Sequence, residues 1–306
     1  MTDALWWIVG LCLAMGTAAL IVSALPHAQE RAVLRFQNSV GVALPAQLGE
    51  ALRRRMLAQH RGYLLGGMTG VTWTALSVSS GMLPMPGHLA AWVIGGGTLA
   101  GGALGVAAAA LLSAGRRLDD RERYARATAV TLSDFLAPID RWLARLPVVF
   151  TVAVFTVSLV GVGLGWTQVV GLPLFINGGI LTAMAVAALI VFEVAVRRIV
   201  SKSRPVGSRE ELVWDDAFRS QVVRELRFAP FMLGFYGLGL TVSGLGLLSD
   251  GEPNGMSLGV FGTLLVCSII ALWAARVSKT RRHFLRRLWP ELAAEADNPH
   301  PVGADA

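Results

Sequence analysis

Long apolar blocks separated by shorter polar segments are the main pattern of this chain. A helix that rises about 1.5 Å per residue needs roughly 20 apolar residues to cross a hydrocarbon layer of about 30 Å. Because backbone amides and carbonyls in lipid must be satisfied within their own segment, each block is expected to be a helix. The pattern predicts an all-α, polytopic membrane helix bundle with seven transmembrane helices. The expected spans are 4–25, 62–83, 88–114, 147–166, 172–196, 229–248 and 257–275.

The basic residues divide the connecting segments into two kinds. All 27 Lys and Arg fall in the segments 26–61, 115–146, 197–228 and 276–306. The opposite connections carry none of them, and cations stay on the cytoplasmic side during insertion. The sequence therefore predicts an outward N-terminus, a cytoplasmic C-terminus and a multi-pass protein of the bacterial cell (inner) membrane.

Composition agrees with lipid as the surroundings of this chain. Its 306 residues are 54% hydrophobic and only 15% charged, and their mean hydropathy is +0.57. A formal net charge of +7 would suggest nucleic acid on a soluble protein. Here its one-sided position predicts the lipid bilayer and anionic lipids as partners, and no nucleic acid. Cys12 and Cys267 lie inside apolar blocks, so no disulfide scaffold is expected.

Two units follow from this pattern, a transmembrane domain over 1–275 and a basic cytoplasmic tail over 276–306. Apolar residues alternate with cations in the tail, which predicts an amphipathic helix lying on the anionic inner leaflet. A docking site for a cytoplasmic protein partner is the alternative. The polar end of the tail is expected to be disordered. The cations at the membrane surface are Arg281, Arg282, Arg286 and Arg287.

Two further features concern how the spans are organised. The first span lacks a positive segment before it and is followed by Arg31 and Arg35, which predicts a retained anchor rather than a cleaved signal peptide. The later spans form three hairpins, 62–114, 147–196 and 229–275, with similar spacing. An ancestral triplication is one explanation, and the general form of any membrane hairpin is the favoured one.

Glycine recurs at every fourth residue in three of the spans. Small residues at this interval form a flat stripe that lets a neighbouring helix approach closely. We expect ordinary packing within one bundle, with a homodimer face or a sliding transporter surface as alternatives. These glycines are Gly66, Gly70, Gly97, Gly101, Gly105, Gly161 and Gly165.

Ionisable side chains are nearly absent from the spans. Glu193 lies near the inner end of its span, and Arg197 four residues later suggests an interfacial ion pair; a role in ion coupling is the alternative. A permease for a neutral or lipidic solute would need a polar path across the bundle. The residues expected to line such a path are Thr69, Thr72, Ser77, Asn177 and Thr182.

Two common motifs for catalysis are missing. HExxH and a phosphate loop do not occur, and the histidines are scattered along the chain. The acidic pairs Asp119-Asp120 and Asp215-Asp216 leave open a magnesium-dependent enzyme that acts on a lipid phosphate. The sequence predicts no catalytic residues, no cofactor and no metal site.

Two loops carry a resemblance to a known group of proteins. They are Tyr124-Ala-Arg-Ala-Thr-Ala-Val-Thr-Leu-Ser-Asp-Phe-Leu136 and Trp214-Asp-Asp-Ala-Phe-Arg-Ser-Gln-Val-Val-Arg224. Both resemble loops of uncharacterised multi-pass integral membrane proteins of high-GC actinobacteria. This resemblance implies origin and topology, and no activity.

These observations favour a non-enzymatic membrane component. We expect an accessory subunit or sensor that works through its basic cytoplasmic face. The alternatives are the permease for a neutral or lipidic solute and the magnesium-dependent enzyme on a lipid phosphate.

Overall fold

The computed structural model describes residues 2–82, 87–113, 130–201, 208–246 and 282–297, and every regular element in these ranges is an α-helix. The all-α class predicted from the sequence is thereby confirmed. The helices are α1 (Thr2–Ala24), α2 (Pro26–Val40), α3 (Ala46–Ser79), α4 (Gly87–Ser113), α5 (Leu132–Phe135), α6 (Pro138–Gly163), α7 (Leu172–Ser201), α8 (Arg209–Leu226), α9 (Phe228–Gly244), α12 (His283–Leu288) and α13 (Pro290–Asp297).

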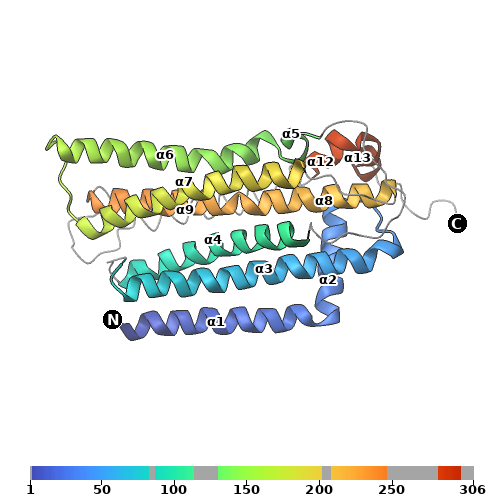
Figure 1. The fold of residues 1–306 in the computed structure, drawn as a ribbon, viewed down its shortest axis with the longest axis horizontal. Helices are drawn as coiled ribbons and strands as arrows, with labels where there is room; N and C mark the ends of the chain where they lie inside the picture. The colour runs from blue at the N-terminus through green and yellow to red at the C-terminus, as the bar shows by residue number, and fades with distance from the viewer. Residues whose placement is uncertain (1, 83–86, 114–129, 202–207, 247–281, 298–306) are drawn as a thin grey trace.

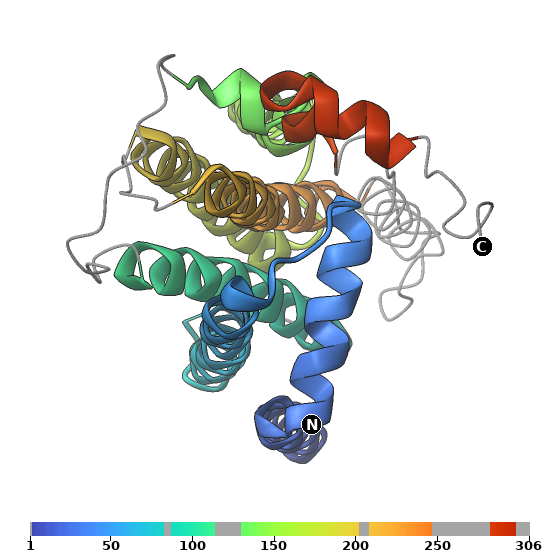
Figure 2. The same cartoon turned by 90° about the vertical axis from the view of Figure 1, so that its right-hand side faces the viewer.

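The long helices lie side by side in successive layers (Figure 1). α1 packs on α3, α3 packs along α4, α4 meets α9, and α9 packs against both α7 and α6. α2 instead runs across the bundle from α1 towards α8, as Figures 1 and 2 both show. It is bent from α1 by 85°. Pro26 occupies the first turn of α2, where proline is tolerated because an amide there has no intrahelical partner.

Two helices in the described ranges, α6 and α7, are long and apolar enough to cross a membrane, and the bent pair of α1 and α2 would be a third candidate. The flanks of α6 expose apolar side chains such as Val149, Phe150 and Val157. The expected span 257–275 lies outside the described residues. α3 is longer than expected, since it runs without a break from Ala46 to Ser79.

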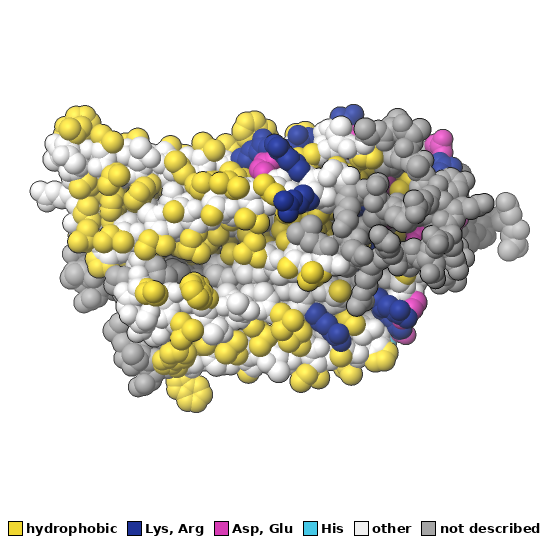
Figure 3. Space-filling model, viewed as in Figure 1, with side chains coloured by type: hydrophobic (Ala, Val, Ile, Leu, Met, Phe, Trp, Pro, Cys, Tyr) yellow, Lys and Arg dark blue, Asp and Glu magenta, His cyan; other side chains and the backbone are white. Residues whose placement is uncertain are grey.

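The described Lys and Arg residues, with most of the acids, lie at one end of the bundle, which we call the charged end (Figure 3). There α2, α5, α8, α12 and the first turns of α3 share one hydrophobic cluster with the neighbouring ends of α4, α6 and α7. The apolar residues at its centre include Phe135, Trp214, Phe218 and Phe284. We call the layer formed by the short helices α2, α5, α8 and α12 the cap.

The tail is part of the cap rather than a helix lying free on lipid. Phe284 and Leu285 of α12 are buried against the cluster, while Arg286 and Arg287 are exposed. The apolar face of the tail thus packs against α5 and α8. α13 continues the helical structure to Asp297, so the tail is ordered further than expected. Arg281 and residues 298–306 lie outside the described ranges.

Glycines bring α3 and α4 into backbone contact. A methyl group built on Gly66 would overlap the carbonyl oxygen of Gly101, and one on Gly70 would overlap that of Gly97. Gly105 has the same relation to Gly62. The two stripes therefore face each other within one chain, as the packing interpretation expected. Backbones come this close only where no side chain intervenes.

The other two glycines serve a different purpose. A Cβ on Gly161 would meet only Thr167, which belongs to the turn that follows α6. Gly165 has φ +73° and nothing within 4 Å of an added Cβ. Its role is conformational, because a left-handed backbone favours glycine in the turn between α6 and α7. A Cβ added at either glycine would therefore not meet another helix.

Replacing Gly101 with alanine should therefore destabilise the bundle. The new methyl group would force α3 and α4 apart, at a cost of about 1–3 kcal/mol. The matched control is Gly10→Ala in α1, where an added Cβ meets nothing within 4 Å. Thermal unfolding of both purified variants in detergent tests this, and equal melting temperatures would contradict it.

Candidate binding pocket at the charged end

α8 is the central helix of the cap, and its sequence explains where it begins. Ser208 accepts a hydrogen bond from the amide of Glu211 at 3.1 Å, and acidic residues occupy the first turn. Both features favour a helix start, because the serine accepts a hydrogen bond from a free amide and the acidic side chains interact favourably with the positive end of the helix dipole. Eleven of the 18 residues of α8 are buried, so its polar side chains must find partners inside the protein.

Asp215 is held between two arginines. Its Oδ1 lies 2.9 Å from Nη1 of Arg55 on α3, and its Oδ2 lies 2.8 Å from Nε of Arg219 on α8. Asp215 is only 2% exposed. A buried carboxylate is tolerated when charge-assisted hydrogen bonds replace its lost hydration. The pairing of Asp215 with Arg55 therefore connects α8 to α3.

Asp216 joins the tail to α8. Its Oδ2 accepts a hydrogen bond from Nε1 of Trp289 at 3.0 Å. The ring of His283 in α12 lies 2.9 Å from the carbonyl oxygen of Ser133, which adds a second polar contact between the tail and the cap. The acidic pair in α8 is therefore engaged in contacts that hold helices together.

Asp140 and Arg227 form a second buried ion pair, between α6 and the start of α9. They are 1% and 4% exposed. Burial lowers the pKa of Arg227 to about 10, which still leaves the guanidinium charged at neutral pH. This pair joins the two helices at the level where the apolar spans end.

Glu193 pairs with a different arginine from the expected one. Its Oε1 accepts a hydrogen bond from Nε of Arg145 on α6 at 2.8 Å, so the contact is between helices rather than within α7. Arg197 lines a shallow pocket with Glu193 but does not form the predicted ion pair. The neighbouring helix brings Arg145 into better geometry than the i+4 spacing offers.

A cavity of about 460 Å³ lies beside the bend between α1 and α2. We call it the elbow pocket. α1, α2 and α3 form most of its wall, and α4 and α8 complete it. Its lining residues are Ala19, Val22, Ser23, Ala28, Gln29, Ala32, Arg35, Arg53, Met56, Leu57, Gln59, His60, Tyr63, Val106, Gln221 and Glu225.

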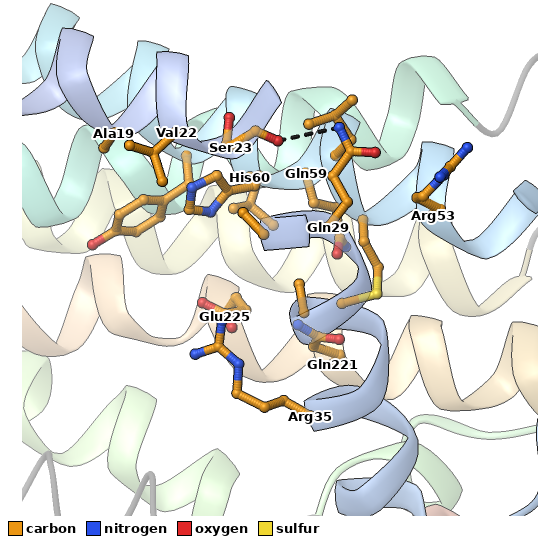
Figure 4. A pocket seen from close by; sticks show the side chains of 16 residues that line it. Ala19, Val22, Ser23, Gln29, Arg35, Arg53, Gln59, His60, Gln221 and Glu225 are labelled. Carbon is orange, nitrogen blue, oxygen red and sulfur yellow. Dashed lines mark hydrogen bonds between the residues drawn. The ribbon is translucent and has the colours of Figure 1, made fainter. Parts of the chain in front are cut away.

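The polar side chains of the elbow pocket come from α1, α2, α3 and α8, and several of them are labelled in Figure 4. Gln29 on α2 donates to the carbonyl oxygens of Ser23 and Ala24 at 3.3 and 3.1 Å, which satisfies the end of α1. Nε2 of Gln59 and Oε1 of Gln221 are buried and without a hydrogen-bond partner. Both side chains line the cavity, so an occupant could satisfy them.

Charge in the elbow pocket is mainly positive. Arg35 and Arg53 contribute two guanidinium groups, and Glu225 is the acidic residue of the lining. Burial lowers the pKa of His60, and the nearby charge of Arg35 lowers it further. His60 is therefore neutral at pH 7. A second cavity of about 320 Å³ shares Arg35, Met56 and Glu225 with the elbow pocket and extends it towards α9.

The residues expected to form a solute path do not come together. Thr69 and Thr72 are exposed on α3, whereas Asn177 and Thr182 are buried on α7 against α9. The hydroxyls of Thr69, Thr72, Ser77 and Thr182 all donate to the carbonyl four residues earlier in their own helix. These side chains thus satisfy themselves locally.

Metal ligands are not clustered in the described part of the chain. No group of three or more His, Cys, Asp or Glu residues there is placed to hold a metal ion. Asp119 and Asp120 lie outside the described residues, and Asp215 and Asp216 have the partners given above.

Sequence reasoning missed the elbow pocket. Gln59 and His60 come directly before the apolar block 62–83, where polar residues are ordinary, and Gln221 lies in an amphipathic loop helix. The proline at position 26, between an apolar block and a polar segment, was the available signal for a bend.

Comparison with known proteins gave no match: no protein-family model, no curated protein and no solved structure matches this chain.

Breaking the buried pair should be costly. Asp140→Asn leaves the Arg227 guanidinium buried without a counter-charge, which should lower the free energy of unfolding by about 3–5 kcal/mol. The exposed pair of Glu50 with Arg54 provides the control, since Glu50→Gln should have little effect. Thermal unfolding in detergent measures both.

The double variant Asp140→Leu with Arg227→Met separates charge from packing. It removes both charges together and should recover most of the lost stability. Equal effects of Asp140→Asn and Glu50→Gln would contradict the role of this pair.

Proposed function

We propose that this chain is a multi-pass protein of the bacterial inner membrane with seven spans, an outward N-terminus and its charged end in the cytoplasm. Support comes from α6 and α7, whose length, composition and exposed apolar side chains suit a bilayer. The one-sided charge agrees with the rule that cations stay in the cytoplasm. The α9 helix, with 17 residues, is at the short end of the roughly 17–25 residues that spans need.

The proposed activity is that of a non-enzymatic accessory or sensor component whose working part is the cap. The observation that carries this proposal is the use of the buried acids: Asp140, Asp215 and Asp216 each contact a side chain outside their own helix. Carboxylates that make such contacts hold the helices of the cap in place rather than take part in a reaction. The cap thereby presents helices to the cytoplasm, and among their exposed side chains are those of Arg286 and Arg287.

Cysteine labelling tests the orientation. In a variant without Cys12 and Cys267, single cysteines would replace Gln168, in the turn between α6 and α7, and Arg287 in α12. A membrane-impermeant maleimide added to intact cells should label Gln168→Cys and leave Arg287→Cys unlabelled until the membrane is opened. Labelling of Arg287→Cys from outside would overturn the proposed topology.

Photo-crosslinking in living cells tests the cap as an interaction surface. p-Benzoylphenylalanine would replace Arg286 or Arg287 in the cap, and Val157 on α6 would serve as the control because its side chain is 72% exposed on an apolar flank. A discrete adduct with a second protein should form from the cap positions and not from Val157. The absence of any protein adduct at both cap positions would contradict the accessory role.

A further inference from the structure

We propose that the elbow pocket binds the headgroup of an anionic phospholipid from the inner leaflet. This headgroup carries a hydroxyl group. The inference rests on the proposed membrane orientation, since that orientation puts the pocket where lipid headgroups lie.

The position of the pocket suits a molecule that is apolar at one end and polar at the other. Its α1 wall is formed by Ala19, Val22 and Ser23, and the Ser23 hydroxyl donates to the Leu20 carbonyl oxygen within this apolar helix. Its α2 and α3 walls carry Arg35, Gln59 and His60. The change from apolar to polar lining follows the bend of 85°, where α1 leaves the bundle direction and α2 crosses the charged end.

Exposed apolar side chains lie near the pocket, at the end of α1 and directly after it. Ile21, Val22 and Leu25 are 64%, 53% and 53% exposed. They offer a surface for acyl chains outside the cavity. The cavity of about 460 Å³ is within the size range of small-molecule sites and suits a headgroup with its glycerol rather than a complete lipid.

The charges of the lining favour an anion. Arg35 and Arg53 supply two positive charges against the one carboxylate of Glu225. Arg53 also contacts Glu50 outside the lining, and in Figure 4 the guanidinium of Arg35 lies towards Glu225. A phosphodiester, with a single negative charge, matches this modest excess. Part of each of Arg35 and His60 is exposed, so the phosphate would bind near the mouth.

Two buried amide groups define the hydrogen bonds that the ligand would make. Gln59 is 6% exposed, and its Nε2 donor has no partner, so a phosphate or ester oxygen could accept from it. The Oε1 acceptor of Gln221 is also unpartnered and would accept from a headgroup hydroxyl. An unmade hydrogen bond of a buried polar group is costly. Phosphatidylglycerol meets both requirements, whereas phosphatidylcholine has no hydroxyl to donate and no net charge.

Native mass spectrometry of the purified full chain in detergent tests the proposal. The protein would be offered equal amounts of phosphatidylglycerol and phosphatidylcholine with the same acyl chains. Phosphatidylglycerol should dominate the bound fraction. Arg35→Gln and Gln59→Leu should each weaken its binding about tenfold, the effect expected when one charge-assisted or buried hydrogen bond is lost.

Arg31→Gln is the matched control. It removes the same charge from α2, one turn before Arg35, at a residue outside the pocket lining. It should leave the preference intact if the site, rather than the general charge of the helix, selects the lipid. The melting temperature of each variant verifies its fold.

Three outcomes would overturn the proposal. They are equal binding of the two lipids, a preference that survives the double variant Arg35→Gln with Gln59→Leu, and competition by glycerol phosphate as strong as by the lipid. The last result would assign the pocket to a soluble phosphate ester. Because binding is measured in detergent, its failure is separate from failure of the topology, which cysteine labelling decides.

Discussion

Pairing between arginines and carboxylates is the interaction on which the charged end of this protein depends. Arg227 with Asp140 joins α9 to α6, Arg55 with Asp215 joins α3 to α8, and Arg145 with Glu193 joins α6 to α7. The buried charges of Asp140, Arg227 and Asp215 would be strongly unfavourable alone and are acceptable beside their partners, whereas the pair of Arg145 with Glu193 is more exposed. Such pairs contribute modest net stability, but they penalise any arrangement that separates the partners. The relative positions of five helices are therefore fixed where the apolar segments end.

The other half of the bundle is held together by shape instead of charge. Along α3 and α4, Gly66 and Gly101 remove the side chains that would keep the backbones apart. In a lipid environment, burying apolar surface gives little gain, so close van der Waals contact becomes the main attraction between helices. A polar side chain in this region has to satisfy itself, as Thr74 does by donating to the Gly70 carbonyl oxygen. Ion pairs thus hold the charged end together, and close backbone packing holds the other half together.

The sequence predicted the helical class and one of the packing surfaces, because both are periodic and local. It failed where the answer depends on which helices become neighbours. The spacing of Glu193 and Arg197 fitted an ion pair, yet Arg145 lies 48 residues away in sequence and is the actual partner. The amphipathic face of the tail was recognised, but its partner was taken to be lipid instead of α5 and α8. Gln59 and Gln221 meet at one cavity only through tertiary structure.

The bend at Pro26 shows how a single local constraint can create a site. Proline supplies no amide to continue the hydrogen-bond ladder of α1, so the helix ends and a new one starts at an angle. Gln29 then donates to the carbonyl oxygens that the break leaves free, which holds the bend in place without a bulky side chain. The space beside the bend is consequently set by the backbone. The bend thereby brings residues of α1, α2 and α3, among them Arg35 and Gln59, around one cavity.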